Sequence, residues 1–532
     1  MGRWTSHIIG SGLCFLIVFP PLAFGSVYPW ATGIIEVVSF SLVLVWLIGV
    51  RLPLREKQGW TWTLPLSFGL PLGLFLVLVL FQMMPMPAIV LKAISPETHA
   101  LYVETVDGYG NAEETRKPAQ TTGEEGGEPA LHDSETGELE GPHEESRAEN
   151  TRNRDDEFRG GFRRWRPLSV YGDATKAEFL KTLAYVCAFL LVLVWVNDSM
   201  RLRRLLYLLV FLGSGIALMG MVQRFLGTDK IYGFWTPLFR KDGSFFGPFV
   251  NPNHFAGYLA LVIPVSVTLL IRQIERIGWR PTWNRRDYLD NLNDRDILFA
   301  VLLCVLMAVM VSGIFVSLSR GGIFALAGSM VFLMTALSFR GRWPRKLGLV
   351  IMAGLFVSLF VFWLGFLPFR AQMETLSRLL QDKSMQFRLD VWRDGWRMFT
   401  DFPLFGTGLG TFAHLYPKYK TVLSQATVMY PENDFLHVVI ETGLVGSGLL
   451  IWFFVAFFRS LWVRWREPDK WLDRINPKVM VGLVAAMVAV LIHGFGDFNL
   501  HIPATALHFV LVMALAVTVK ARKDQAERAG VK

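Results

Sequence analysis

Apolar stretches of about 20 residues recur along the whole of this 532-residue chain. A helix of that length crosses the hydrocarbon core of a bilayer. About twelve such stretches can be counted. They cover residues 7–26, 31–50, 63–83, 178–196, 204–224, 254–271, 297–318, 321–338, 347–366, 435–457, 478–496 and 502–520. The sequence therefore predicts an all-α polytopic membrane protein.

Composition agrees with this prediction. Only 18% of the residues are charged and 52% are hydrophobic, which leaves too little charge to cover a string of soluble domains. The three cysteines all lie inside apolar runs, so neither a disulfide framework nor a Cys-x-x-Cys metal site is expected. We interpret the first run, which lacks a small-residue cleavage site, as a retained helix.

Loop charge predicts the orientation of the helices. If the N-terminus is cytoplasmic, every loop on that side is rich in Lys and Arg, as the positive-inside rule requires. These loops are 51–57, 201–204, 272–286, 340–346 and 459–470. Both termini are then cytoplasmic, and so is the basic tail 521–532. The formal net charge of +9 is thus mainly an orientation signal, and no nucleic-acid partner is expected.

Two long loops divide the helices on the outer side. The resulting segments are helices 1–83, loop 84–177, helices 178–366, loop 367–434 and helices 435–520. In the first loop, residues 104–157 contain 17 acids and 5 bases. Because so polar a tract buries little apolar surface, we expect a disordered insertion there.

The second long loop contains an amphipathic pattern. Met385, Leu389, Trp392, Trp396 and Phe399 follow one another at steps of four and three, which places them on one helical face. The charged residues on the other face are Arg388, Asp390, Arg393, Asp394 and Arg397. Such a helix can lie along the outer membrane surface or over the helical bundle. The glycines at 406, 408 and 410 predict a flexible turn rather than a dinucleotide fingerprint, because no buried strand precedes them.

Polar clusters at the outer ends of helices are the candidate functional residues. Asn251 and Asn253 flank a proline, where they could bind sugar hydroxyls or simply cap a helix. Arg320 lies in the tight link between two apolar helices, where its forked donors suit a bound phosphate or a structural ion pair. Arg388 is either a second phosphate-binding group or a solvated charge.

Carboxylates and amides gather at the last two outer turns. Glu432, Asn433 and Asp434 precede one apolar helix, and Glu441 lies two turns further into the membrane. The candidates of the other turn are His493, Asp497 and Asn499. A metal site made of His493, Asp497 and His501 would match no standard ligand spacing, and a structural polar turn is the preferred interpretation. Arginines suit a pyrophosphate and carboxylates suit activation of a hydroxyl, a combination that fits glycan transfer from a lipid pyrophosphate.

These motifs, in this order, resemble the O-antigen ligase and polymerase (Wzy-C) family over about 245–505. The motifs that carry the resemblance are Asn251-Pro252-Asn253, Ser319-Arg320-Gly321, Arg388 to Trp392, Pro403 to Gly408, Glu432-Asn433-Asp434 with Glu441-Thr442-Gly443, and Asp497 to Leu500. One departure is visible, because family ligases carry His where this chain has Glu432.

The resemblance implies a GT-C-type glycosyltransferase of the bacterial inner membrane, with its active site at the periplasmic face. Its donor would be an undecaprenyl-pyrophosphate-linked glycan, and its acceptor a glycan, a lipid or a protein. Family arginines that bind the donor pyrophosphate correspond to Arg320 and Arg388. Glu432, Asn433 and Asp434 would be catalytic, with Glu432 as base, while the remaining polar residues line the cavity. No cofactor is expected, although a divalent metal is not ruled out.

The main alternative is a transporter, such as a flippase for lipid-linked oligosaccharide, since many helices with charged cavities also suit that function. A scaffold protein in polysaccharide assembly is a third hypothesis. The position of the polar clusters on one side, and not near the midplane, favours the enzyme.

Overall fold

The computed structural model describes residues 2–51, 66–106, 109, 165–236, 245–277, 294–339, 383–422, 427–466 and 477–518. The long helices are α1 (Arg3–Leu22), α2 (Pro29–Arg51), α3 (Leu66–Met83), α7 (Gly172–Trp195), α8 (Ser199–Leu226), α9 (Pro252–Arg276), α11 (Asp294–Val316), α12 (Arg320–Ser338), α15 (Lys383–Asp401), α17 (Asp434–Arg466), α18 (Pro477–His493) and α19 (Pro503–Val517). The short elements are η1 (Phe24–Ser26), β1 (Pro85–Met86), α4 (Ala88–Ile94), α5 (Pro96–Thr105), β2 (Arg166–Pro167), α16 (Phe412–Leu415), η4 (Tyr416–Lys418) and η6 (Asn499–His501).

The apolar helices match the predicted membrane spans. Within the described residues, eight helices are long and apolar enough to cross a membrane, and three shorter apolar helices accompany them. Together they overlap every predicted span except 347–366, which lies outside the described residues. The chain is thus a multi-pass, mostly helical membrane protein, while the total of about twelve spans stays a prediction.

Helix α9 forms the centre of the bundle. Every residue from His254 to Ile271 is buried, as expected of a helix that is apolar around its whole circumference. α9 packs against α8, α11, α12 and α18, and α19 packs against α18 and α7. This core positions the first turn of α9, where Asn251 and His254 lie, against the turn that follows α18.

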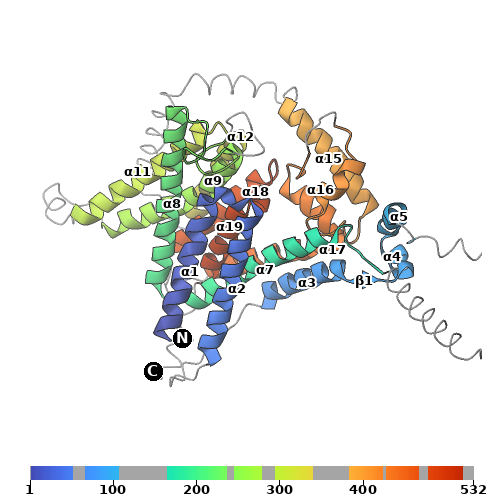
Figure 1. The fold of residues 1–532 in the computed structure, drawn as a ribbon. Helices are drawn as coiled ribbons and strands as arrows, with labels where there is room; N and C mark the ends of the chain where they lie inside the picture. The colour runs from blue at the N-terminus through green and yellow to red at the C-terminus, as the bar shows by residue number, and fades with distance from the viewer. Residues whose placement is uncertain are drawn as a thin grey trace, which may run out of the picture.

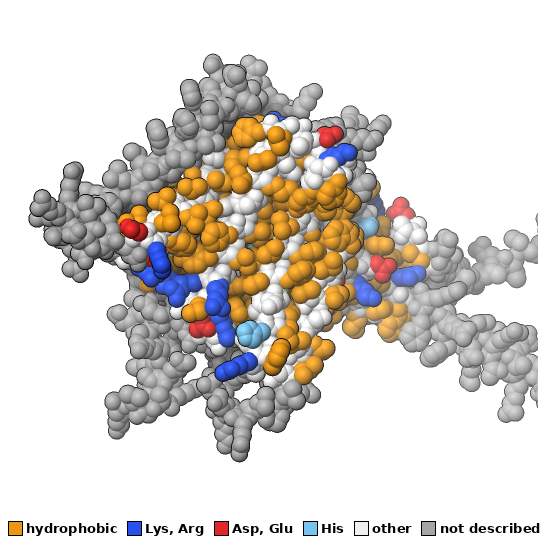
Figure 2. Space-filling view, turned by 60° about the vertical axis from the view of Figure 1, so that its left-hand side comes forward, with side chains coloured by type: hydrophobic (Ala, Val, Ile, Leu, Met, Phe, Trp, Pro, Cys, Tyr) orange, Lys and Arg blue, Asp and Glu red, His pale blue; other side chains and the backbone are white. Residues whose placement is uncertain are grey.

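The surface of the bundle is strongly apolar. Figure 2 shows a broad hydrophobic face, with Lys and Arg side chains gathered toward its lower border. In Figure 1 the same end of the molecule holds the start of α1 and the end of α2. An apolar band bordered by basic residues is the pattern expected of a protein surface in contact with lipid.

The loop predicted over 84–177 contains ordered structure that the sequence analysis missed. Helices α4 and α5 follow α3, and β1 pairs antiparallel with β2, which leads into α7. Leu91, Tyr102 and Leu168 form a small apolar core there. Of the tract expected to be disordered, residues 104–105 belong to α5, and nearly all of the rest lies outside the described residues.

Helix α15 forms where the amphipathic pattern predicted a helix, but burial in the structure does not follow the division into an apolar and a charged face. Leu389 and Trp396 are 38% and 56% exposed, whereas Val391, Met398 and Asp394 are fully buried. Asp394 is buried because it has partners that replace water. It accepts hydrogen bonds from the hydroxyl of Tyr416 at 3.1 Å and from the N–H and hydroxyl of Thr421 at 2.9 and 2.8 Å. Leu389 and Trp396 therefore face outward, as apolar side chains do on a helix lying at a membrane surface.

A small second core holds α15 against α16, η4 and the first turns of α17, beside the bundle (Figure 1). Its buried members are Val391, Met398, Phe402, Phe412, Leu415, Tyr416, Val428 and Ile440. Arg388 lies about one turn before Val391, so this core fixes its position.

Helix α17 is broken at Gly443, whose φ is 62°. The segment 403–408 packs into the break and supplies partners for the freed backbone groups. The N–H groups of Thr407 and Gly408 donate to the carbonyls of Ile440 and Glu441 at 3.0 Å each, and the N–H of Leu444 donates to Pro403 at 2.8 Å. Non-helical backbone at membrane depth is tolerated only when it is satisfied by protein in this way.

The glycines at 406, 408 and 410 form a packed turn, so the prediction of a flexible turn was wrong. All three have positive φ. A Cβ on Gly406 would lie 2.3 Å from the carbonyl carbon of Glu441, and one on Gly408 would lie 2.4 Å from the hydroxyl oxygen of Ser169. The glycines are required by close approach of backbone and not by flexibility.

Gly406→Ala is expected to destabilise the protein by about 2–5 kcal/mol, the sum of a left-handed non-glycine residue and an overpacked contact. The matched control is Gly448→Ala, also in α17, where a Cβ would meet nothing within 4 Å. Thermal unfolding of the detergent-purified variants would measure the difference. Equal midpoints for the two variants would contradict the described packing.

Candidate functional site

Arg388 and Glu432 meet at the junction of α15 with the loop before α17. Nη2 of Arg388 donates to Oε2 of Glu432 at 3.4 Å, and their side chains are 19% and 25% exposed. Nε of Arg388 is buried and has no hydrogen-bond partner among the described residues. A guanidinium with an unused donor beside a carboxylate is suited to receiving an anionic ligand.

Glu432 has two unusual properties. Its φ is 54°, a left-handed conformation that costs a non-glycine residue about 1–3 kcal/mol and is found mainly at functional sites. Burial raises the pKa of its carboxyl, and the negative charge of Asp497 raises it further, whereas Arg388 and His254 oppose the rise. A carboxylate with a raised pKa is a stronger base than an ordinary surface glutamate.

Asn433 and Asp434 hold the turn together. Oδ1 of Asn433 caps α17 by accepting from the N–H groups of Phe435 and Leu436 at 3.0 Å each, and its amide donates to the carbonyl of Phe495 at 3.1 Å. Asp434 is buried and accepts from the N–H of Leu500 at 3.0 Å. These contacts give both residues a positioning role, and their predicted catalytic role stays a prediction.

Asp497 links the start of α9 to the end of α18. Its Oδ1 lies 3.4 Å from Nε2 of His254, and its Oδ2 lies 3.8 Å from Nε2 of His493. Burial raises the pKa of Asp497, but the contacts with His254 and His493 and the N–H of Phe498 outweigh it, so the net shift is downward. Asp497 is therefore a fixed negative charge close to Glu432.

His493 is buried between Gly321 of α12 and Gly257 of α9. Gly321, next to Arg320 at the start of α12, packs so closely on the His493 ring that a Cβ would lie 2.7 Å from Nε2. From the opposite side, a Cβ on Gly257 would lie 2.8 Å from Nδ1 of His493 and 2.5 Å from Oδ1 of Asn499. Asn499 is fully buried, and within the described residues neither end of its amide has a partner.

At the start of α9, Asn251 caps the helix by accepting from the N–H of Asn253 at 3.0 Å, which confirms the capping interpretation. Sugar binding by Asn251 and Asn253 stays a prediction.

The five polar clusters found in the sequence are joined by direct contacts. These contacts link α9 to the turn at Asp497, α12 to α18, α15 to Glu432, and the start of α17 to the turn 494–501.

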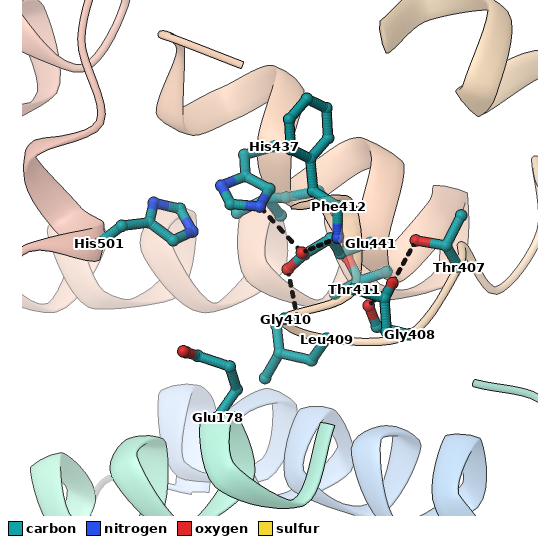
Figure 3. A network of polar contacts seen from close by, with 12 residues as sticks. Glu178, Thr407, Gly408, Leu409, Gly410, Thr411, Phe412, His437, Glu441 and His501 are labelled. Carbon is teal, nitrogen blue, oxygen red and sulfur yellow. Dashed lines mark hydrogen bonds and ion pairs between the residues drawn. The ribbon is translucent and has the colours of Figure 1, made fainter. Parts of the chain in front are cut away.

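Glu441 lies beside the break in α17 and holds the glycine turn. Its two oxygens accept from the N–H groups of Gly410 and Phe412 at 2.7 and 2.9 Å, and its Oε1 lies 2.9 Å from Nε2 of His437 (Figure 3). The side chain of Gln82 donates to the Glu441 carbonyl at 2.9 Å.

Sequence reasoning missed His437 and the role of His501. The His437 ring stacks on His501 with centroids 3.9 Å apart, and Nδ1 of His501 lies 2.8 Å from Oδ1 of Asp434. The spacing of His437 and Glu441, four residues on one helix, was visible in the sequence. The approach of η6 to the start of α17 was not.

A comparison with known protein families adds an independent finding. The family model described as O-antigen ligase (Wzy_C) matches residues 302–451. Residues 302–451 are similar to the O-antigen ligase family. The resemblance inferred from the motifs is confirmed over these residues. A comparison with curated proteins gave no match.

The domain matched by the family model contains half of the site. Arg320, Arg388, Glu432 and Glu441 lie inside the matched residues, whereas the α9 cluster and the 493–501 turn lie outside them. Because these outside clusters contact the domain directly, the site is completed by flanking helices. The chain is thus a multi-pass membrane protein with a region similar to O-antigen ligases.

Proposed function

We propose that this protein transfers or polymerises glycan from undecaprenyl-pyrophosphate-linked oligosaccharide, at the periplasmic face of the bacterial inner membrane. Both termini would be cytoplasmic, and the helical bundle would have GT-C-type architecture. The acceptor would be a glycan, a lipid or a protein. The observation that carries the proposal is the pairing of Arg388 with Glu432, 3.4 Å apart, inside the region similar to O-antigen ligases.

In the proposed reaction, Glu432 accepts the proton of an acceptor hydroxyl as its oxygen attacks the anomeric carbon of the donor. The bond between that carbon and the pyrophosphate oxygen breaks, and the pyrophosphate leaves with the electron pair. Arg388 and Arg320 stabilise the developing negative charge. Attack opposite the leaving group inverts the configuration at the anomeric carbon. No metal is needed for these steps.

The electrostatics of the site support this division of roles. Arg388 holds Glu432 in place before the donor binds and has an unused Nε donor for a phosphate oxygen. Once the pyrophosphate draws Arg388 toward itself, Glu432 loses its stabilising partner, and its basicity increases. Asp497, a buried negative charge near Glu432, acts in the same direction.

A flippase is the competing function, because broken helices beside a binding site also occur in transporters, and α17 is broken beside Glu441. Deleting the gene distinguishes the two. A transferase deletion should leave the lipid-linked donor on the outer leaflet, where an added membrane-impermeant lectin or glycosidase reaches it. Donor accumulating only on the cytoplasmic leaflet would contradict the proposal and indicate the flippase.

The raised pKa of Glu432 predicts the pH profile of the reaction. The base must be ionised, so activity is present above the pKa of Glu432 and is lost as the pH falls through it. Because that pKa lies above the ordinary value of 4.5, the acid limb should lie above pH 4.5 as well. Asp497→Asn removes a negative charge that raises this pKa and should move the limb to lower pH. Initial rates of lipid pyrophosphate release across pH 4–8 would measure it, and a limb that moves upward would count against Glu432 as the base.

A further inference from the structure

Two imidazoles and a carboxylate come together beside the break in α17, outside the Arg388–Glu432 pair. His437 and Glu441 share one face of α17, and His501 reaches them from η6 (Figure 3). Their candidate ligand atoms all lie within 4.8 Å of one another. His437 and Glu441 are 2% exposed. Two histidines and one carboxylate are a frequent ligand set for Zn²⁺ and related divalent ions.

The surroundings of this cluster are those of a ligand shell. Nδ1 of His501 lies 2.8 Å from the buried carboxylate of Asp434, which leaves Nε2 of the same ring for another partner. Carboxylates bonded to the second nitrogen of a metal-binding histidine orient the ring and raise its basicity. Glu441 is held by two backbone N–H groups, so its position is also fixed.

The arrangement of the two imidazole rings gives a second reason. The His437 and His501 rings stack with centroids 3.9 Å apart at an interplanar angle of 22°. The stacking accompanies a close approach of the ligand atoms, because one nitrogen of each ring lies within 4.8 Å of the other and of a Glu441 oxygen. Nδ1 of His437 has no hydrogen-bond partner among the described residues, so nothing there fixes the ring in a single tautomer.

We propose that His437, Glu441 and His501 bind a divalent transition-metal ion with the ligand preferences of Zn²⁺. The ion takes the place of the proton between His437 and Glu441, and that proton is released on binding. Three protein ligands leave a position for water or another ligand, on the side where Glu178 of α7 faces the cluster (Figure 3). The site does not depend on the proposed glycan transfer, which uses Glu432, Arg388 and Arg320.

Metal binding to the full-length protein tests this directly. The protein, purified in detergent without a histidine tag and stripped with chelator, is titrated with Co²⁺ and followed by visible absorption, with Zn²⁺ as competitor. We expect one equivalent of Co²⁺ with d–d bands of a nitrogen- and oxygen-ligated ion, abolished by Zn²⁺. His437→Ala and His501→Ala should each remove the bands. Asp434→Asn, which keeps all three ligands, should weaken binding by about 10–100-fold.

The matched control is His414→Ala, which removes an exposed imidazole that stacks on Tyr171. It should bind Co²⁺ as the unmodified protein does. Unchanged thermal midpoints without metal would establish that the His437 and His501 variants are folded. If a variant is unfolded, the site is tested on the unmodified protein instead, by the rise in its thermal unfolding midpoint when Zn²⁺ is added. Absence of any d–d band and of any Zn²⁺-induced stabilisation, or binding unaffected by both histidine variants, would overturn the proposal.

Discussion

Glu432→Gln is expected to reduce the rate of glycan transfer by about 10²–10⁴-fold, the usual contribution of a general base. The amide keeps the shape of the side chain and can still contact Arg388, but it cannot accept a proton from the acceptor hydroxyl. Donor binding should therefore change little. Transfer is measured as release of lipid pyrophosphate by the purified variant with donor and acceptor present.

The control for this variant is Glu104→Gln, which neutralises a glutamate whose side chain is 69% exposed and paired with Lys418. It should retain full activity, since an exposed ion pair contributes little. A Glu432→Gln protein that is folded and as active as Glu104→Gln would remove Glu432 from the base role. The 2.9 Å pair of His437 and Glu441 would then be the next place to look for a base.

Arg388→Ala is expected to lower the rate by about 10²–10³-fold, because it removes a donor directed at the charge that develops on the leaving pyrophosphate. Arg388→Lys should restore only part of the rate, since lysine supplies a point charge without the forked donors of arginine. The donor concentration that gives half-maximal rate should rise in both variants.

Arg393→Ala is the matched control on the same helix. Arg393 lies about one and a half turns after Arg388 on α15. Its side chain is 64% exposed and forms a surface ion pair with Asp390. Its loss should leave both the rate and the donor dependence nearly unchanged. Equal losses in the Arg388 and Arg393 variants would indicate a general charge effect on α15 and no specific pyrophosphate contact.

Much of the fold follows from the apolar runs. A membrane helix makes its backbone hydrogen bonds internally, so it can be predicted from the length and composition of its own segment. The polar clusters were also visible, because charged groups between apolar helices are costly and therefore rare. Glu432, Arg388 and Asp497 were all found in this way. Their direct contacts depend on helix packing, which local composition does not encode.

Other features could not be predicted from local patterns. The periodicity of α15 placed Asp394 on a solvated face, yet Tyr416 and Thr421 provide partners that allow its burial. Likewise, Gly443 within an apolar run gives no sign that residues 403–408 enter the helix break there. Glu441 therefore looked like a free intramembrane carboxylate, although the structure shows it bonded to Gly410 and Phe412.

Reconstitution with a doubly labelled donor tests the central claim most directly. The purified protein in liposomes receives a lipid-linked oligosaccharide labelled in both the pyrophosphate and the glycan, together with an acceptor. We expect labelled glycan to appear on the acceptor in equal amount to the labelled lipid pyrophosphate released, and neither to appear with Glu432→Gln. Intact labelled donor moving between leaflets, without release of lipid pyrophosphate, would contradict the account.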